Sequence, residues 1–191
     1  MSKPRSDPRS PGDERKFREL ILYISQNCAN DPSFGAVKLN KILFFADFAH
    51  FAHYGKPLTG IEYRKLNQGP VPRRLIPIRE SMIANRELAV QEMPIVGSLV
   101  QQCPVNLRQP NLDLFTAKEI ALVDAVIKAL DGLTAKKTSD LSHGMQAWKL
   151  AEDGQTIPYG AVFLGNSKPT ERDIARGLEI AKEHGLLVAA E

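Results

Sequence analysis

The chain has 191 residues, of which 43% are hydrophobic and 25% are charged, and its formal net charge is +3. This length fits one domain with an appendage or at most two small domains, and the composition excludes wholesale disorder and fibrous repeats. No run of about 18 apolar residues is present to span a bilayer, and the first residues lack the apolar segment of a secretory signal. Cys28 and Cys103 form neither a CxxC motif nor a disulfide framework, so we expect a protein of the reducing cytoplasm.

The positive charge lies in the first part of the chain. Residues 1–110 hold 16 Lys and Arg against 10 Asp and Glu, whereas residues 111–191 hold 9 against 12. Part of the excess forms a middle basic cluster, which consists of Arg64, Lys65, Arg73, Arg74 and Arg79. Such a cluster can follow a phosphate backbone, but a net charge of +3 is far below that of dedicated nucleic-acid binders and favours a solvated surface.

The N-terminal third predicts a basic arm followed by two helices. Prolines, serines and charges over residues 1–13 predict a disordered arm, after which apolar residues recur at helical spacing as far as Asn30-Asp31-Pro32. From Ala36 to about residue 53, the apolar residues surround the helix axis instead of forming a stripe. A helix that is apolar on all sides is buried, so we expect the other elements to pack around this central helix, which ends at Gly55 and Pro57.

The middle of the chain predicts short strands and one helix. A strand over residues 61–66 leads into a turn at residues 67–70, and residues 71–86 predict a helix that is interrupted near Pro77. Residues 88–93 and 99–107 predict the two strands of an antiparallel hairpin. Pro104 should confine the second strand to an edge or a bulge.

Helical signals return in the last third. Thr116 and Glu119 form a capping box, residues 134–142 predict another helix, and Pro158 suits the first turn of a short one. Residues 170–185 predict a final helix with one apolar stripe, formed by Ile174, Leu178 and Ala181. The sum is a mainly helical α+β fold, with helices around the central helix and a small antiparallel sheet. We expect residues 166–191 to pack as a C-terminal helix on the same domain.

Two groups of residues are candidates for chemistry. Asp47, His50 and His53 are spaced by three along the central helix and could form a facial metal triad. A further ligand at helical spacing is missing, so a structural role is favoured and no metal or other cofactor is expected. Ser142 and His143 are adjacent in sequence, but a nucleophile and its base are recognised by their geometry in space. His143 stands at a helix C-terminus, where the helix dipole favours a cation.

Three further residues have two interpretations each. Lys38 and Lys41 can lay their stems along apolar neighbours while the ammonium groups reach solvent or a carboxylate, whereas a catalytic lysine would have to be buried. Trp148, the only tryptophan, fits the core better than an interface anchor, although both remain open. The chain has no GxSxG, Walker A or GxGxxG motif, and no single motif establishes an enzyme.

Several segments, taken in order, resemble the Panacea domain of the SocA-like antitoxin family, which occurs in bacteria and prophages. Residues 38–47, KLNKILFFAD, are similar to the "KLxKLLYFAD" helix of that family. They are followed by YGKPL at 54–58, GPVP at 69–72, LSH at 141–143, Trp148 and IPY at 157–159. The resemblance covers about residues 14–165, and Ala147 departs from the proline that many members carry.

The resemblance implies a non-enzymatic antitoxin that neutralises a cognate protein toxin by direct contact, the toxin being encoded nearby. We expect a structural or partner-binding role for the residues of the family motifs, which are Lys38, Leu39, Lys41, Asp47, Tyr54, Gly55, Gly69, Pro70, Val71, Ser142, His143 and Trp148. The middle basic cluster and the hairpin at 88–107 are candidates for the partner surface. The alternatives are a DNA-binding or proteolysis-adaptor regulatory protein of phage or prophage origin, and a metal-dependent enzyme built on the Asp47 triad.

Overall fold

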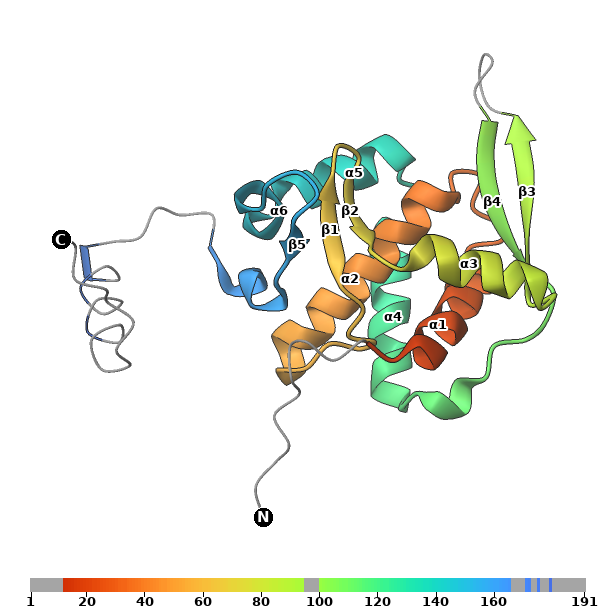
Figure 1. The fold of residues 1–191 in the computed structure, drawn as a ribbon, viewed down its shortest axis with the longest axis horizontal. Helices are drawn as coiled ribbons and strands as arrows, with labels where there is room; N and C mark the ends of the chain where they lie inside the picture. Colours follow the sequence, from red (N-terminus) through yellow and green to blue (C-terminus); the bar gives the residue numbers. More distant parts are fainter. Residues whose placement is uncertain (1–11, 95–99, 166–170, 173–174, 176–178, 180–191) are drawn as a thin grey trace.

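Helix α2 (Ala36–Tyr54) is the element around which the others pack in the computed structural model, which describes residues 12–94, 100–165, 171, 172, 175 and 179 (Figure 1). It contacts α1, α4, α5, β2, β4 and η2. Five of its large apolar side chains are at most 2% exposed, namely Leu39, Ile42, Leu43, Phe44 and Phe48. The prediction of a buried central helix is therefore confirmed.

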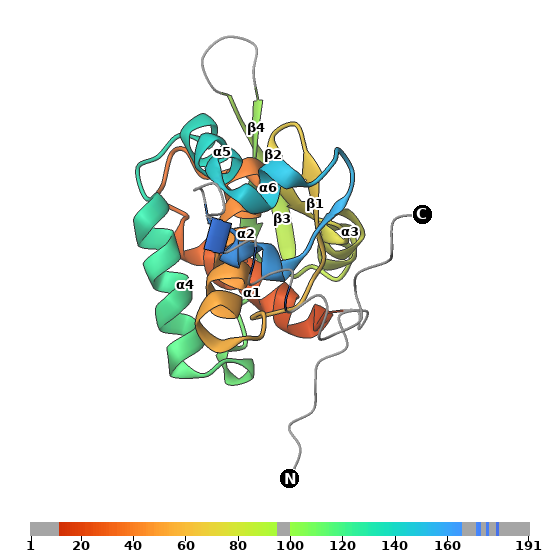
Figure 2. The same cartoon turned by 90° about the vertical axis from the view of Figure 1, so that its left-hand side faces the viewer.

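The other helices surround this central one. Helix α1 (Glu14–Asn27) packs against α2 and α4 (Ala117–Leu130), and Figure 2 shows α4 running beside α2 with α5 (Ala135–Gly144) and α6 (Gln146–Leu150) above them. The predicted capping box begins α4, since the Thr116 hydroxyl accepts from the Glu119 backbone N–H at 3.3 Å and the Glu119 carboxylate accepts from the Thr116 N–H at 2.8 Å.

A three-stranded antiparallel sheet covers another side of α2. Strands β1 (Tyr63–Leu66) and β2 (Gly69–Pro72) form a hairpin, and β5 (Thr156–Ile157) adds to the free edge of β1, so that the strand order is β2-β1-β5. Strand β2 contains two prolines, which suits an edge position because proline has no N–H to donate to a neighbouring strand. The predicted strand is confirmed over residues 63–66, whereas the turn is shorter than predicted, because Gly69 and Pro70 already belong to β2.

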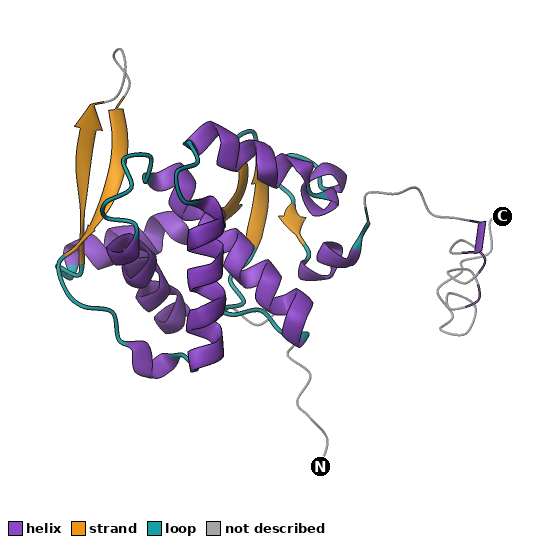
Figure 3. Cartoon of the chain, turned by 180° about the vertical axis from the view of Figure 1, so that it is seen from behind, coloured by secondary structure: helices purple, strands orange, loops and turns teal. Residues whose placement is uncertain are grey.

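The second sheet is the predicted hairpin of β3 (Leu88–Pro94) and β4 (Val100–Asn106), which projects beyond the helical body (Figure 3). Leu88 pairs with Asn106 at the base, and Val90 lies opposite Pro104. The base is buried at Leu88, whereas the β3 residues from Gln91 to Pro94 are exposed. The outer half of β3 is therefore free of the core, whereas β4 packs against α1 and α2 and is buried at Pro104.

Three details of the sequence-based prediction are wrong. Residues 71 and 72 belong to β2, and α3 (Leu75–Ala84) is continuous through Pro77. Pro77 is the third helical residue, and proline is tolerated in a first turn because the N–H groups there have no partner within the helix. Pro158 likewise precedes the 3-10 helix η2 (Tyr159–Phe163) as its N-cap instead of opening its first turn.

Some predicted segments lie outside the described residues. These are most of the basic arm and most of the final helix at 170–185, of which only residues 171, 172, 175 and 179 are described. A further short 3-10 helix, η1 (Leu112–Leu114), lies between β4 and α4. None of the described helices is long and apolar enough to cross a membrane.

Candidate functional site

Four polar side chains of the buried helix α2 are the centre of the candidate site. Lys38, Lys41, Asp47 and His50 are each at most 3% exposed. A buried polar group is costly unless it finds a hydrogen-bond partner, and each of these four has a partner in a different segment of the chain. They therefore connect α2 to the loops around it.

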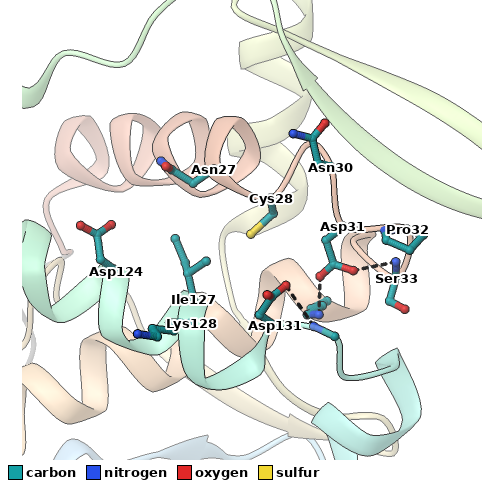
Figure 4. A pocket seen from close by; sticks show the side chains of 12 residues that line it. Asn27, Cys28, Asn30, Asp31, Pro32, Ser33, Asp124, Ile127, Lys128 and Asp131 are labelled. Atoms are coloured by element: carbon teal, nitrogen blue, oxygen red, sulfur yellow. Dashed lines mark hydrogen bonds and ion pairs between the residues drawn. The ribbon is translucent and has the colours of Figure 1, made fainter.

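Lys38 connects α2 to two turns. Its ammonium group forms an ion pair with Asp31, in the turn between α1 and α2, and donates a hydrogen bond to the Leu133 carbonyl at 2.9 Å, in the turn between α4 and α5. Beside this pair lies an open pocket of about 520 Å³, between the end of α1, the following turn and the end of α4 (Figure 4).

Several polar groups of this pocket have partners within the fold. Burial raises the pKa of the Cys28 thiol to about 12, so that it stays protonated and is a poor nucleophile. Asp124 accepts from the Tyr23 hydroxyl at 2.6 Å, and Asp131 accepts from the Gly132 N–H at 3.0 Å. Among the lining residues, no nucleophile is hydrogen-bonded to a base, so the pocket lacks the pairing that nucleophilic catalysis requires.

Lys41, three residues further along α2, contacts the β1–β2 hairpin instead of the two turns that Lys38 contacts. Its ammonium group donates to the Pro70 carbonyl at 3.2 Å, and no carboxylate of the described residues forms an ion pair with it. Burial lowers the pKa of this lysine to about 8. A buried cation whose partner is a neutral carbonyl destabilises the fold, in contrast to the paired Lys38.

Gly69 brings three of the family-like segments together. A Cβ at this position would lie 2.5 Å from the Ser142 hydroxyl and 2.7 Å from Cε of Lys41, and φ of Gly69 is +96°. Only glycine fits here without strain, because it has no Cβ and readily adopts a positive φ. The KLNK, GPVP and LSH segments, which are distant in the sequence, therefore pack against one another.

Ser142 and Lys41 do not form a reactive pair, although they are close. The Ser142 hydroxyl is fully buried and donates to the Ser139 carbonyl at 2.7 Å, so no substrate can reach it. Ser139 in turn donates to the Gln68 carbonyl at 3.1 Å. These hydrogen bonds join α5 to the turn between β1 and β2.

Trp148 is half-buried and lies between His143 and Lys65. The His143 ring stacks on it with ring centroids 4.1 Å apart, and Nζ of Lys65 lies 4.1 Å from the Trp148 ring centroid. Lys65 also donates to the Ala151 carbonyl at 3.0 Å. Burial and the nearby charge of Lys41 lower the pKa of His143, which opposes the effect of the helix C-terminus. Trp148 thus packs against the hydrophobic core and contacts His143 and Lys65.

Asp47 holds the segment that follows α2. Its carboxylate accepts from the Thr59 N–H and hydroxyl, both at 2.6 Å, and from the Tyr63 hydroxyl at 2.7 Å. Burial raises the pKa of Asp47, against the opposing effect of these hydrogen bonds. Gly55, with φ of +69°, ends α2 in the left-handed conformation and turns the chain toward Thr59.

Asp47, His50 and His53, which could have formed a metal triad by their spacing, do not come together as one. Asp47 is engaged with Thr59 and Tyr63, Nδ1 of His50 lies 2.7 Å from the Lys56 carbonyl oxygen, and His53 is exposed in the last turn of α2. In the part of the chain that the structure describes, no three His, Cys, Asp or Glu side chains are placed to hold a metal ion. The hydrogen bonds favour the structural alternative for Asp47 and His50. Of the remaining motif residues, Leu39 is buried, Val71 is half-buried and Tyr54 is 49% exposed.

The middle basic cluster is distributed over three elements. Arg64 and Lys65 are successive residues of β1, so their side chains point to opposite faces of the sheet. Arg73 and Arg74, between β2 and α3, are about half exposed and pair with Glu62 at 3.4 Å and with Glu14 at 3.0 Å. Arg79 lies on α3 and is half-buried. The five residues therefore do not form one unpaired basic patch.

One ionic network at the base of the β3–β4 hairpin was not predicted. Arg108 forms ion pairs with Glu19 at 2.7 Å and with Glu87 at 2.6 Å, and Glu87 also pairs with Arg18. Burial alone would raise the pKa of Glu19, but the hydrogen bonds from Arg108 and the Asn111 N–H outweigh it, and the pKa is lowered. The residues of this ionic network are far apart in the sequence, so no local sequence pattern indicates the network.

Comparison with known proteins gives one match. A family model described as "Antitoxin SocA-like, Panacea domain" matches residues 39–149. No curated protein and no solved structure matches the chain. The matched range begins in α2 and ends in α6, so it contains Lys41, Asp47, Gly69, Ser142 and Trp148.

Replacing Asp47 tests its role as an anchor. Asp47→Ala removes the acceptor of three buried hydrogen bonds and should lower the free energy of unfolding by about 3 kcal/mol or more. Urea denaturation measures the change, and Asp153→Ala, which removes an exposed carboxylate, is the control with an expected effect below about 0.5 kcal/mol. Equal effects of the two substitutions would show that Asp47 is not an anchor.

The two buried lysines should respond oppositely to replacement by methionine. Lys38→Met leaves the buried Asp31 carboxylate unpaired and should destabilise the fold by about 3 kcal/mol, whereas Lys41→Met removes an unpaired buried cation and should stabilise it by about 1–2 kcal/mol at pH 7.

The effect of Lys41 should also depend on pH. The pKa of Lys41 is about 8 in the fold against an ordinary value of 10.5, so the unfolded chain holds more protons between these values and stability rises with pH there. The advantage of Lys41→Met should therefore be greatest below pH 8, and the change of about 3 kcal/mol toward pH 10.5 should turn it into a disadvantage. Urea denaturation of the wild-type chain and of Lys41→Met at several pH values measures the difference in their free energies of unfolding. A difference that is independent of pH would contradict this prediction.

Proposed function

The chain belongs to the SocA-like antitoxin family with a Panacea domain, and from this premise we propose that it neutralises a cognate protein toxin by binding it directly. The family match, which covers residues 39–149, is the observation that carries the proposal. The toxin would be encoded beside this chain, and neutralisation would need no catalytic step. This function is consistent with the internal hydrogen bonds of Lys41, Asp47 and Ser142, which serve the fold.

If the motif residues serve the fold, the toxin has to contact the outer surface. The β3–β4 hairpin is the first candidate, because Met93 is 44% exposed and Val100 is 53% exposed near its tip. In this two-stranded sheet each strand has one edge without a neighbouring strand, and such an edge can accept a strand of a partner. An isolated hairpin is only marginally stable, and the Arg108 network at the base orients this one.

The second candidate is the basic surface at Arg73 and Arg74. Their ion pairs with Glu62 and Glu14 are about half exposed, and exposed pairs contribute little to stability. The two guanidinium groups can therefore exchange these partners for carboxylates of the toxin. Electrostatic complementarity would accelerate association with an acidic surface.

Co-expression tests the proposed function and the hairpin together. The protein encoded by the adjacent reading frame should arrest growth when it is expressed alone, and this chain should relieve the arrest and co-purify with it. Met93→Asp with Val100→Asp should weaken binding at least about tenfold, which corresponds to about 1.4 kcal/mol. Leu150→Asp with Leu164→Asp is the matched control, since it also adds two carboxylates, at positions that are 67% and 50% exposed and lie away from the hairpin.

Calorimetry on the purified pair gives the affinities. A neighbour that causes no growth arrest and does not co-purify would refute the proposed function. Full affinity in the Met93 and Val100 variant would refute only the role of the hairpin.

Charge reversal tests the basic surface. Arg73→Glu with Arg74→Glu should reduce the association rate for the toxin, and the reduction should be larger at low salt because screening is weaker there. Lys118→Glu with Lys137→Glu makes the same change in net charge at exposed positions of α4 and α5 and serves as the control. Stopped-flow kinetics at two salt concentrations measure the association rates of both double variants with the toxin. Equal rates for the two double variants would contradict the proposal.

A further inference from the structure

A further surface feature is an open apolar groove lined by residues of α2, α4 and α5. These three helices lie together on the side of the molecule that faces the viewer in Figure 2. The volume of the groove is about 410 Å³, and its lining is entirely apolar: Phe45, Phe48, Ala49, Val126, Ala129, Leu130, Leu141, Met145 and Val162. Ala129 is exposed and Leu141 is 50% exposed, so the groove faces solvent in the described part of the chain. Exposed apolar surface of this kind indicates a missing contact.

We infer that the C-terminal segment of this same chain, residues 166–191, covers this groove with the apolar stripe of Ile174, Leu178 and Ala181. The first argument is position. Val162 lines the groove, and the continuously described chain ends three residues later, at Gly165. The tail therefore starts at the rim of the surface that it would cover.

The second argument is sequence pattern and reach. Ile174, Leu178 and Ala181 follow one another at spacings of four and three, which places them on one face of a helix. The five residues from Gly165 to Thr170 can span up to about 17 Å, and the stripe itself is about 10 Å long at a rise of 1.5 Å per residue. The face opposite the stripe carries charge at Arg172, Arg176 and Glu183, as expected of a helix with one side in water.

The third argument concerns competition between possible occupants. A segment attached by a short linker has an effective concentration in the millimolar range, well above the concentration of a second copy or of a separate toxin. An apolar stripe tethered beside an apolar groove therefore occupies it first. The contact is independent of toxin binding, so its failure would leave the proposed function untouched.

Thiol labelling in the full-length chain tests this inference. Ala129→Cys places a thiol in the groove, and peptide mass spectrometry distinguishes it from buried Cys28 and half-buried Cys103. Combining it with Ile174→Asp and Leu178→Asp should accelerate maleimide labelling of the introduced thiol at least tenfold. Arg172→Gln with Arg176→Gln changes the net charge equally on the opposite face and should leave the labelling rate unchanged.

Cross-linking provides a second readout that needs no disruptive substitution. Ala129→Cys with Leu178→Cys should form an intramolecular disulfide under mild oxidation, and Ala129→Cys with Arg176→Cys should not. Equal labelling in all tail variants would overturn the inference. It would also be overturned by protection that depends on protein concentration, which indicates a second copy, or by protection that begins only when toxin is added.

Discussion

The polar side chains buried on α2 are the constraint on which the rest of the structure depends. A helix that is apolar on every side can pack in many rotations, because apolar contacts have no direction. The hydrogen bonds of Lys38, Lys41, Asp47 and His50 do have direction, and each requires one particular loop at one particular place. Four anchors on one rigid helix therefore determine where the α1–α2 turn, the β1–β2 hairpin and the segment after α2 lie.

This arrangement separates the fold from the surface that a partner would contact. Lys38, Asp47 and Ser142 make internal contacts, and Gly69 permits the close packing of Lys41 against Ser142. Lys41 remains costly, since its partner is a neutral carbonyl and burial depresses its pKa. A scaffold of this kind leaves its outer hairpin and loops available for different partners without changing the core.

The sequence predicts those elements whose formation depends on residues that are close together in the chain. The all-round apolar pattern of residues 36–53, the capping box at Thr116 and the strands around residues 88–107 are local signals, and the structure contains each of these elements. The predicted interruption at Pro77 was wrong because the effect of a proline depends on where the helix begins, and the sequence pattern does not specify that residue. The Arg108–Glu19 pair joins residues 89 positions apart, and the Lys41–Pro70 contact joins residues 29 apart. Such contacts follow from the packing of whole elements, so the candidate site was less predictable than the fold.

The central claim is that the motif residues of α2 form a scaffold and that the toxin binds the outer surface. Hydrogen–deuterium exchange of the chain alone and in complex with the toxin tests it most directly, because it reports every backbone segment in the intact protein. The account predicts new protection in the β3–β4 hairpin and in the segment from Arg73 to Leu75, with unchanged exchange in α2 around Lys41 and Asp47. Protection that is confined to α2, with the hairpin and the basic surface unchanged, would contradict it.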